Sequence, residues 1–283
     1  MTKVDLHSHS TISDGTMTPR ELVTHAATQG VQVLALTDHD DVAGIGEAQR
    51  VGAEVGVTVI AGTEISVTWH NRTLHIVGLR VDPQQPELVQ GLQRLRDSRR
   101  VRAELIAAEL EKIGMQGVLQ GAYAYASEHI ISRTHFARFM IDQGYAKDMK
   151  SVFKHYLVKG KPGYVHHYWA TLDEAVSWIR AAGGIPVIAH PGRYDLGRTL
   201  MDLLLTEFKT VGGLGVEVVS GSHTPEHYRQ FAALAQRFDL LASRGSDYHG
   251  PGHGYFDMGK LPDLPANCRP VWEGWEEVLK LAA

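Results

Sequence analysis

The sequence predicts an α/β fold in which largely parallel strands alternate with helices. Short apolar runs recur in the first and last parts of the chain, and each run ends in polar residues. Amphipathic patterns with helix-start signals separate these runs. The order strand, helix, strand favours parallel pairing through crossover helices. The expected strands are 4–6, 31–36, 57–60, 74–77, 185–189, 215–219 and 240–243.

Helix boundaries support this interpretation. Thr18 with Glu21 forms a capping box around Pro19, and Thr171 with Glu174 forms another. Another helix is expected near residues 225–238. Residues 272–281 should form a last helix or a closing element.

The stretch from residue 84 to 164 differs from the rest because it contains long helical patterns and little strand signal. We therefore expect an α/β body made of residues 1–83 and 165–283, with residues 84–164 as a helical insertion.

Composition excludes several classes of protein. The 283 residues carry 28 Lys and Arg against 32 Asp and Glu, a net charge of −4, which argues against a protein that coats duplex DNA. No run of roughly 18 apolar residues and no apolar signal segment is present, so we expect no membrane interaction and a cytoplasmic location. The single Cys268 agrees with a reducing compartment and excludes a cysteine-based zinc site.

Histidine and acidic residues gather where predicted strands give way to loops. Parallel strands bring their carboxyl ends to one rim, so groups distant in sequence should converge there and need a cation. Mixed nitrogen and oxygen ligands suit Mn, Fe or Zn better than Ca or Mg. The segments are His7-Ser8-His9 with Asp14, Thr37-Asp38-His39-Asp40, Thr63-Glu64, Ala189-His190-Pro191 and Ser246-Asp247-Tyr248-His249, with His75 inside a further strand.

Each piece also has a plain structural interpretation. An isolated His-x-His pair is more often packed than ligating, and His75 alone would be a core histidine. Asp38 and Asp40 could form a turn. The coincidence at five strand ends favours metal binding. Glu217 is similarly placed, but no ligand motif flanks it, and it is not included among the candidates.

Taken in order, these motifs resemble those of the PHP (polymerase and histidinol phosphatase) metallo-phosphoesterases. The resemblance implies a distorted (β/α)7 barrel with two or three divalent ions, Mn being the first choice and Fe or Zn the alternatives. It also implies that Asp40 orients a ligand imidazole. The implied ligand sets are His7, His9, Glu64 and Asp247 for one ion, Glu64, His75 and His190 for a second, and Asp14, His39 and His249 for a third.

Such a cluster indicates hydrolysis by an activated water. A covalent route is disfavoured because the chain has no Gly-x-Ser-x-Gly elbow and its thiol lies far from every motif. His39 or His249 is a candidate proton donor to the leaving oxygen. The residues expected at the reaction centre are Asp14, His39, Glu64, Asp247 and His249.

The insertion carries arginines on an apolar stripe. At 100° per residue, Arg99 and Arg102 fall on the face that also carries Leu88, Leu92, Leu95, Ile106, Leu110 and Ile113. An unpaired buried charge is expensive, so these arginines need an anion. Asp97 and Glu104 lie off the stripe, which leaves a substrate phosphate or an acid from another segment as the partner.

A second anion pocket is expected where Ser132 opens a helix, with Arg133, Thr134 and His135 as its contacts. The alternative is a plain N-cap by Ser132.

Two anion sites beside a metal centre suit a substrate with two phosphates. Within the family, this arrangement resembles the branch that acts on nucleoside 3′,5′-bisphosphates and on 5′ ends of short RNA. We expect release of the 3′-phosphate from such a nucleotide, with short RNA as a further substrate and no obligate protein partner. The alternatives are a histidinol-phosphate phosphatase and a non-enzymatic module associated with a polymerase.

Overall fold

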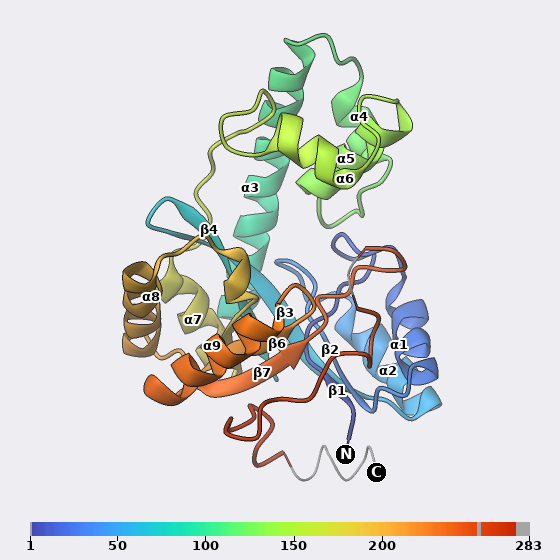
Figure 1. The fold of residues 1–283 in the computed structure, drawn as a ribbon. Helices are drawn as coiled ribbons and strands as arrows, with labels where there is room; N and C mark the ends of the chain where they lie inside the picture. Colours follow the sequence, from blue (N-terminus) through green and yellow to red (C-terminus); the bar gives the residue numbers. More distant parts are fainter. Residues whose placement is uncertain (1, 254–255, 276–283) are drawn as a thin grey trace.

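A seven-stranded sheet forms the body of the protein, as the computed structural model shows for residues 2–253 and 256–275 (Figure 1). The strands lie in the sheet in the order in which they occur in the sequence. They are β1 (Val4–Asp5), β2 (Val33–Leu36), β3 (Thr58–Trp69), β4 (Arg72–Leu79), β5 (Ile185–Ile188), β6 (Gly215–Ser220) and β7 (Leu241–Gly245).

Parallel pairing holds for β1 to β3 and again for β5 to β7, as the alternating pattern predicts. Strand β4 is the exception, because it runs antiparallel to both β3 and β5. It joins β3 through a two-residue turn in which His70 and Asn71 both have positive φ, at 44° and 57°. Both strands of this hairpin are therefore longer than the expected runs 57–60 and 74–77.

The sheet nearly closes on itself, because backbone bonds link its first and last strands. The N–H of Leu6 donates to the carbonyl of Arg244 at 2.9 Å. Gly245 permits this approach, since a Cβ at that position would lie 2.3 Å from the Cβ of His7. The expected distorted (β/α)7 barrel is confirmed.

Helices from the parts of the chain before and after the insertion pack on the outside of the barrel. Thr18 and Thr171 form the predicted capping boxes at the first and third of them. The helices are α1 (Pro19–Thr28), α2 (Ile45–Val55), α7 (Leu172–Ala181), α8 (Arg198–Thr210) and α9 (Pro225–Arg237), with a short 3-10 turn, η2 (Pro191–Arg193), after β5.

Apolar side chains fill the barrel, so it is a packed core and not a pore. Leu6, Val33, Val77 and Val187 lie in this interior cluster and are buried. Val271 and Trp275 join the same cluster, so the described part of the segment 272–281 helps to close the barrel. Residues 276–281 of that segment lie outside the described residues.

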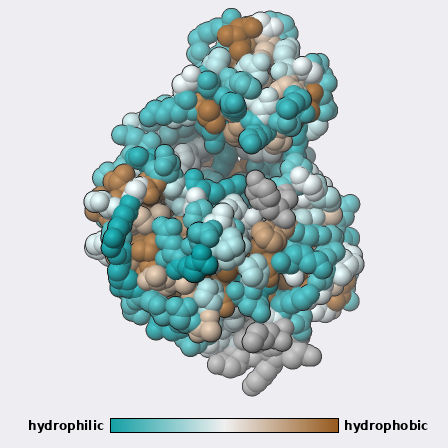
Figure 2. All heavy atoms as spheres, in the orientation of Figure 1, coloured by the Kyte–Doolittle hydropathy of each residue, from teal (hydrophilic) through white to brown (hydrophobic). Residues whose placement is uncertain are grey.

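The insertion stands apart from the barrel, with a core of its own (Figures 1 and 2). It contains α3 (Pro86–Glu111), α4 (Val118–Tyr123), α5 (Arg133–Asp142), α6 (Met149–Val152) and the π-helical turn η1 (Phe153–Leu157). Helix α3 belongs to both bodies, because Leu88 and Leu92 pack in the barrel cluster while Ile106 and Leu110 pack in the insertion cluster. The division of the chain at residues 84 and 164 stays a prediction.

No helix in the described part of the chain combines the length and apolar character needed to cross a membrane.

Candidate active site

Imidazoles and carboxylates from distant segments meet at one end of the barrel. His7 and His9 follow β1, His39 follows β2, and His190 follows β5. Asp247 and His249 follow β7. The structure thus brings all nine predicted ligands into one neighbourhood.

One group of potential ligands consists of two histidines and two acids, His7, His9, Glu64 and Asp247. The Nε2 atoms of His7 and His9 both lie 3.3 Å from Oε2 of Glu64. They lie 3.4 and 3.2 Å from Oδ1 of Asp247. Four donor atoms at such spacing can share one ion.

Glu64 also faces a second set of imidazoles. Its Oε1 lies 2.9 Å from Nδ1 of His75 and 2.9 Å from Nε2 of His190. Its Oε2 lies 2.9 Å from Nδ1 of His39. With its two oxygens engaged by different histidines, Glu64 can bridge two ions.

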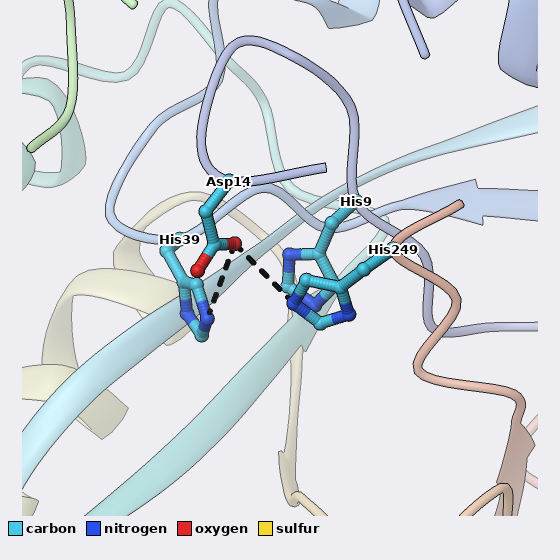
Figure 3. A group of neighbouring side chains, drawn as sticks. All are labelled: His9, Asp14, His39 and His249. Atoms are coloured by element: carbon cyan, nitrogen blue, oxygen red, sulfur yellow. Dashed lines mark ion pairs between the residues drawn. The ribbon is translucent and has the colours of Figure 1, made fainter. Parts of the chain in front are cut away.

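Asp14 forms the third group with His39, His249 and His9 (Figure 3). Its Oδ1 lies 3.3 Å from Nε2 of His249 and 3.8 Å from Nε2 of His39.

Unpartnered polar atoms show that this donor set suits divalent cations. Four buried atoms facing the cluster make no hydrogen bond to any residue that the structure describes, although an unsatisfied buried polar atom is costly. They are His7 Nε2, Asp14 Oδ1, His39 Nδ1 and Glu64 Oε2. Nitrogen and oxygen donors of this kind suit first-row metals.

Charge pairing keeps the acids of the cluster ionised. Burial alone would raise the pKa of Glu64, but the neighbouring His75, His39 and His7 hold it well below its ordinary value. The pKa of Asp14 is likewise lowered by His39 and His249 against the effect of burial. Both side chains therefore present the negative charge that a cation requires.

Glu217, which sequence reasoning set aside, orients two of the histidines. Its Oε1 accepts a hydrogen bond from Nδ1 of His7 at 2.7 Å, and its Oε2 accepts one from the backbone N–H of His190 at 2.5 Å. The first bond leaves Nε2 of His7 free to face Glu64 and Asp247. A carboxylate behind a ligand imidazole fixes its tautomer in this way.

The backbone at this rim is strained. His190 and Asp247 have φ of 27° and 56°, values that non-glycine residues adopt at a cost of about 1–3 kcal/mol. Both residues directly follow β-strands or their extensions, and the left-handed conformation turns the chain so that their side chains reach the cluster.

Glu64 is not at a strand end, contrary to the sequence interpretation, whereas His75 lies inside a strand, as expected. Both lie within the β3–β4 hairpin, which continues past the point where β2 stops pairing with β3 at Ala61. Because this hairpin extends over the rim, residues in mid-strand still reach the cluster.

A cavity of about 350 Å³ lies between the metal-ligand cluster and the insertion. Residues of both bodies line it, including Asp14, Glu64, Arg102, Arg133, Trp169 and Arg193. In Figure 2 the molecule narrows between the insertion and the barrel.

The structure corrects the partner expected for Asp40 and shows which of the two alternatives for Arg99 applies, although Arg99 also lines the cavity. Nε of Arg99 donates to Oδ2 of Asp40 at 2.8 Å, and the other carboxylate oxygen accepts from the N–H of Ser66. Asp40 thus holds a guanidinium and not an imidazole. An acid 59 residues away neutralises Arg99, so its burial does not require a substrate anion.

Arg102 has no such acid among the described residues. Its side chain is 9% exposed, and its Nε has no hydrogen-bond partner. Burial, followed by the charges of Arg133 and Arg99, lowers its pKa to about 9. The Arg133 guanidinium donates to the carbonyl of Leu157, and its pKa is lowered by burial and by Arg99. These two arginines form a cationic wall.

The start of α5 differs from the expected anion pocket. His135 lies outside the cavity lining, because its Nδ1 accepts a hydrogen bond from the N–H of Ser132 in a capping box. Burial lowers the pKa of His135 to about 4, so it stays neutral. Thr134 lines the cavity, but its hydroxyl donates to Oδ2 of Asp14 at 3.1 Å.

Two residues of the site carried no sequence signal. NH1 of Arg193, on η2, donates to Oδ2 of Asp247 at 2.5 Å. The Trp169 ring lies 4.7 and 5.3 Å from the guanidinium carbons of Arg99 and Arg102. A lone arginine or tryptophan in a loop has no local pattern that would have revealed these contacts.

The family model of the PHP domain matches residues 5–220. The chain belongs to the PHP domain family. Among its PHP relatives is a 3′,5′-nucleoside bisphosphate phosphatase of Chromobacterium violaceum, 49% identical over 277 residues, or 98% of this chain and 97% of the relative. A 5′-3′ exoribonuclease of Escherichia coli is 42% identical over 275 residues, covering 96% and 94% of the two chains.

A solved structure also resembles this PHP protein along its full length. It is an amidohydrolase from Chromobacterium violaceum with bound sulfate and no metal, 48% identical and with a TM-score of 0.94. The similarity covers 98% of this chain and 97% of that one.

Proposed function

We propose that this protein is a metal-dependent phosphoesterase that hydrolyses the 3′-phosphate of nucleoside 3′,5′-bisphosphates to give nucleoside 5′-phosphates and phosphate. One observation carries the proposal: a single cavity joins a cage of metal ligands to two arginines without an acidic partner among the described residues. The relative named as a bisphosphate phosphatase supports the same substrate.

Arg102 and Arg133 bind the 5′-phosphate in this proposal. A bound dianion would offset both their mutual repulsion and the cost of burying their positive charges. Guanidinium groups also match the geometry of phosphate oxygens. Trp169 lies against Arg102, and Phe153 lies 5.5 Å from the guanidinium carbon of Arg133. A cationic substrate such as histidinol phosphate would meet repulsion at this wall.

The ligand residues hold the other end of the substrate at the reaction centre. When bound, divalent ions supply Lewis acidity and a water of lowered pKa for attack at phosphorus. Arg193 engages Oδ2 of Asp247, which leaves Oδ1 directed at His7 and His9. Half of the Arg193 side chain is exposed, so it can also contact the phosphate that leaves.

We infer Mn²⁺ as the ion, with Fe or Zn as alternatives, because the donor set mixes imidazole and carboxylate. Arg102 and Arg133 would also bind the 5′-phosphate of a short RNA. The relative named as a 5′-3′ exoribonuclease supports stepwise removal of nucleotides as a second activity.

Phosphate release from three esters tests the proposal: a nucleoside 3′,5′-bisphosphate, the corresponding 3′-monophosphate and histidinol phosphate. The bisphosphate should have the highest kcat/KM and yield the 5′-phosphate. Arg102→Gln should raise KM for the bisphosphate about 10- to 100-fold, the loss of one charged hydrogen bond or two. KM for the 3′-monophosphate should change little.

Arg100→Gln is the matched control, because Arg100 is exposed on the same helix and forms an ion pair with Asp97. This substitution should leave KM unchanged for both the bisphosphate and the 3′-monophosphate. Equal efficiency on the bisphosphate and the monophosphate in the wild-type protein would remove the basis for the second phosphate site.

A further inference from the structure

Helix α5 of the insertion reaches across to a metal ligand of the barrel. The hydroxyls of Thr134 and Ser132 both donate to Oδ2 of Asp14, at 3.1 and 3.3 Å. One turn further along α5, NH2 of Arg138 donates to the backbone carbonyl of Asp14 at 2.7 Å. The side chain and the backbone of Asp14 are therefore both held by the insertion, more than 110 residues away in the sequence.

These contacts divide the two oxygens of the Asp14 carboxylate. Oδ2 accepts the hydroxyls, whereas Oδ1 is buried without a hydrogen-bond partner in the described part of the chain. Oδ1 is the oxygen that faces Nε2 of His249 and of His39 (Figure 3). The hydroxyls thus fix the carboxylate rotamer in which one oxygen points at the histidines.

Capping of α5 does not explain the Thr134 hydroxyl. The cap is made by the Ser132 side chain, which accepts from the N–H of Thr134, and by His135, which accepts from the N–H of Ser132. The hydroxyl of Thr134 has Asp14 as its partner instead. A hydroxyl on the first turn of a helix in the insertion is therefore committed to a carboxylate on the barrel.

We propose that Thr134 and Ser132 are positioning residues for a divalent ion held by Asp14, His39 and His249, so that this ion binds tightly only when α5 is docked on the barrel. The inference rests on the proposed metal centre, but it does not depend on which ester the protein hydrolyses. It gives the insertion a second task besides its contribution to phosphate binding.

The orientation of a ligand by its hydrogen-bond partners typically accounts for 10- to 100-fold in metal affinity. Thr134→Val keeps the shape of the side chain, removes only the hydroxyl and leaves the cap intact. We expect it to lower the affinity for one Mn²⁺ ion by roughly 10-fold or more and to leave the affinity for the other ions unchanged. Thr134→Ser, which restores the hydroxyl, should recover most of the affinity.

Isothermal titration of the chelated full-length protein with Mn²⁺, followed by metal analysis after dialysis, measures this effect. Asp14→Asn identifies the ion, since it should lose the same one. Thr206→Val is the control, because that hydroxyl donates to the backbone carbonyl of Asp202 on the exposed face of α8, away from the ligand cluster. Circular dichroism verifies that each variant folds.

Two outcomes overturn the proposal. Thr134→Val could retain every affinity while Asp14→Asn loses an ion, in which case the hydroxyl does not position the ligand. Alternatively, Asp14→Asn could lose no ion, in which case Asp14 does not ligate. No ester is present in the titration, so a normal metal pattern in a protein inactive on bisphosphates would count against the proposed function alone.

Discussion

At the scale of single residues, Glu217 shows how one buried carboxylate can organise a metal centre without facing it. It accepts from Nδ1 of His7 and from the backbone N–H of His190, and it is 1% exposed. Burial raises its pKa, and these two donors oppose that effect. Both contacts are donors, so only a group with two acceptor oxygens satisfies them.

Glu217→Gln should therefore lower metal affinity about 10- to 100-fold. An amide offers one oxygen only, so its NH₂ group would confront either His7 or the N–H of His190. Competition with a chromophoric chelator measures the affinity. Glu226→Gln, an exposed change on α9, is the matched control. Unchanged affinity in Glu217→Gln would show that His7 keeps its tautomer without the carboxylate.

Arg99 illustrates a different lesson at this scale. An arginine on the apolar face of a helix indicates that an anion must lie nearby. The sequence pattern does not show whether this anion is a substrate or an acidic side chain. The acid proved to be Asp40, from the loop after β2. Arg102, three positions along the same face, is the one without an acidic partner among the described residues.

At the scale of elements, the short turn η2 is held in place by a histidine. Nε2 of His223 accepts from the N–H of Gly192, and Nδ1 donates to the carbonyl of Val218. His223 is buried, and burial lowers its pKa from 6.5 to about 4, with smaller contributions from His227 and Arg193. The turn carries Arg193 into the cavity, so this neutral imidazole supports the site.

Stability should consequently depend on pH through His223. Below pH 6.5 the unfolded chain binds a proton that the folded protein does not bind, so stability falls as the pH drops towards about 4 and levels off below it. The full effect is about 3 kcal/mol. His223→Gln, which can make both hydrogen bonds without titrating, should lose correspondingly less stability over this range.

Urea unfolding of both proteins at about pH 7 and about pH 4.5 gives the comparison. The difference between the two proteins isolates His223 from the other buried histidines. The same loss of stability in both would mean that His223 is not neutral in the folded state.

Helix α3 joins the insertion to the barrel through a close contact with α7. A Cβ on Gly91 would lie 2.5 Å from Cδ2 of Trp178. Gly91→Ala should therefore destabilise the protein by about 1–3 kcal/mol through overpacking, despite the better helix propensity of alanine.

Gly46→Ala provides the control for this change. Gly46 lies in α2, and a Cβ at that position would meet no other part of the described chain within 4 Å beyond the local backbone of its own helix. It should leave stability unchanged or raise it by up to about 1 kcal/mol, as measured by thermal unfolding. A neutral Gly91→Ala would indicate that α3 can move away from α7 without cost.

At the scale of the whole molecule, the metal-ligand cluster brings together residues that follow the first and the last strand of the barrel. Its residues come from β3, β4 and the segments after β1, β2, β5 and β7, and Asp14 is also bonded to α5 of the insertion. An ion bound there contacts only the folded state, so it should stabilise the fold by mass action.

Removal of divalent metal should therefore lower the melting temperature by about 5–10 °C, given about 2.7 kcal/mol at a metal concentration 100-fold above Kd. Differential scanning calorimetry with chelator and with added Mn²⁺ measures the shift. Asp247→Ala should abolish most of it, because this acid belongs to a four-residue ligand group. The same melting temperature with chelator and with added Mn²⁺ would contradict tight metal binding.

The sequence by itself determined the alternation of strands and helices, the caps at Thr18 and Thr171, and the choice of most residues at the rim. Periodicity, caps and ligand motifs are encoded by residues a few positions apart, so they can be recognised without a fold. The order of the motifs along the chain was recognisable through its resemblance to the PHP family.

Only the tertiary structure decided which groups are satisfied and which are free. Asp40 neutralises Arg99, Glu217 orients His7, and Thr134 bonds to Asp14, although each pair is separated by at least 59 positions. The antiparallel hairpin that carries Glu64 and His75 past the strand ends belongs to the same class. Such contacts depend on how separate segments pack, and nothing local in the chain records their distance or direction.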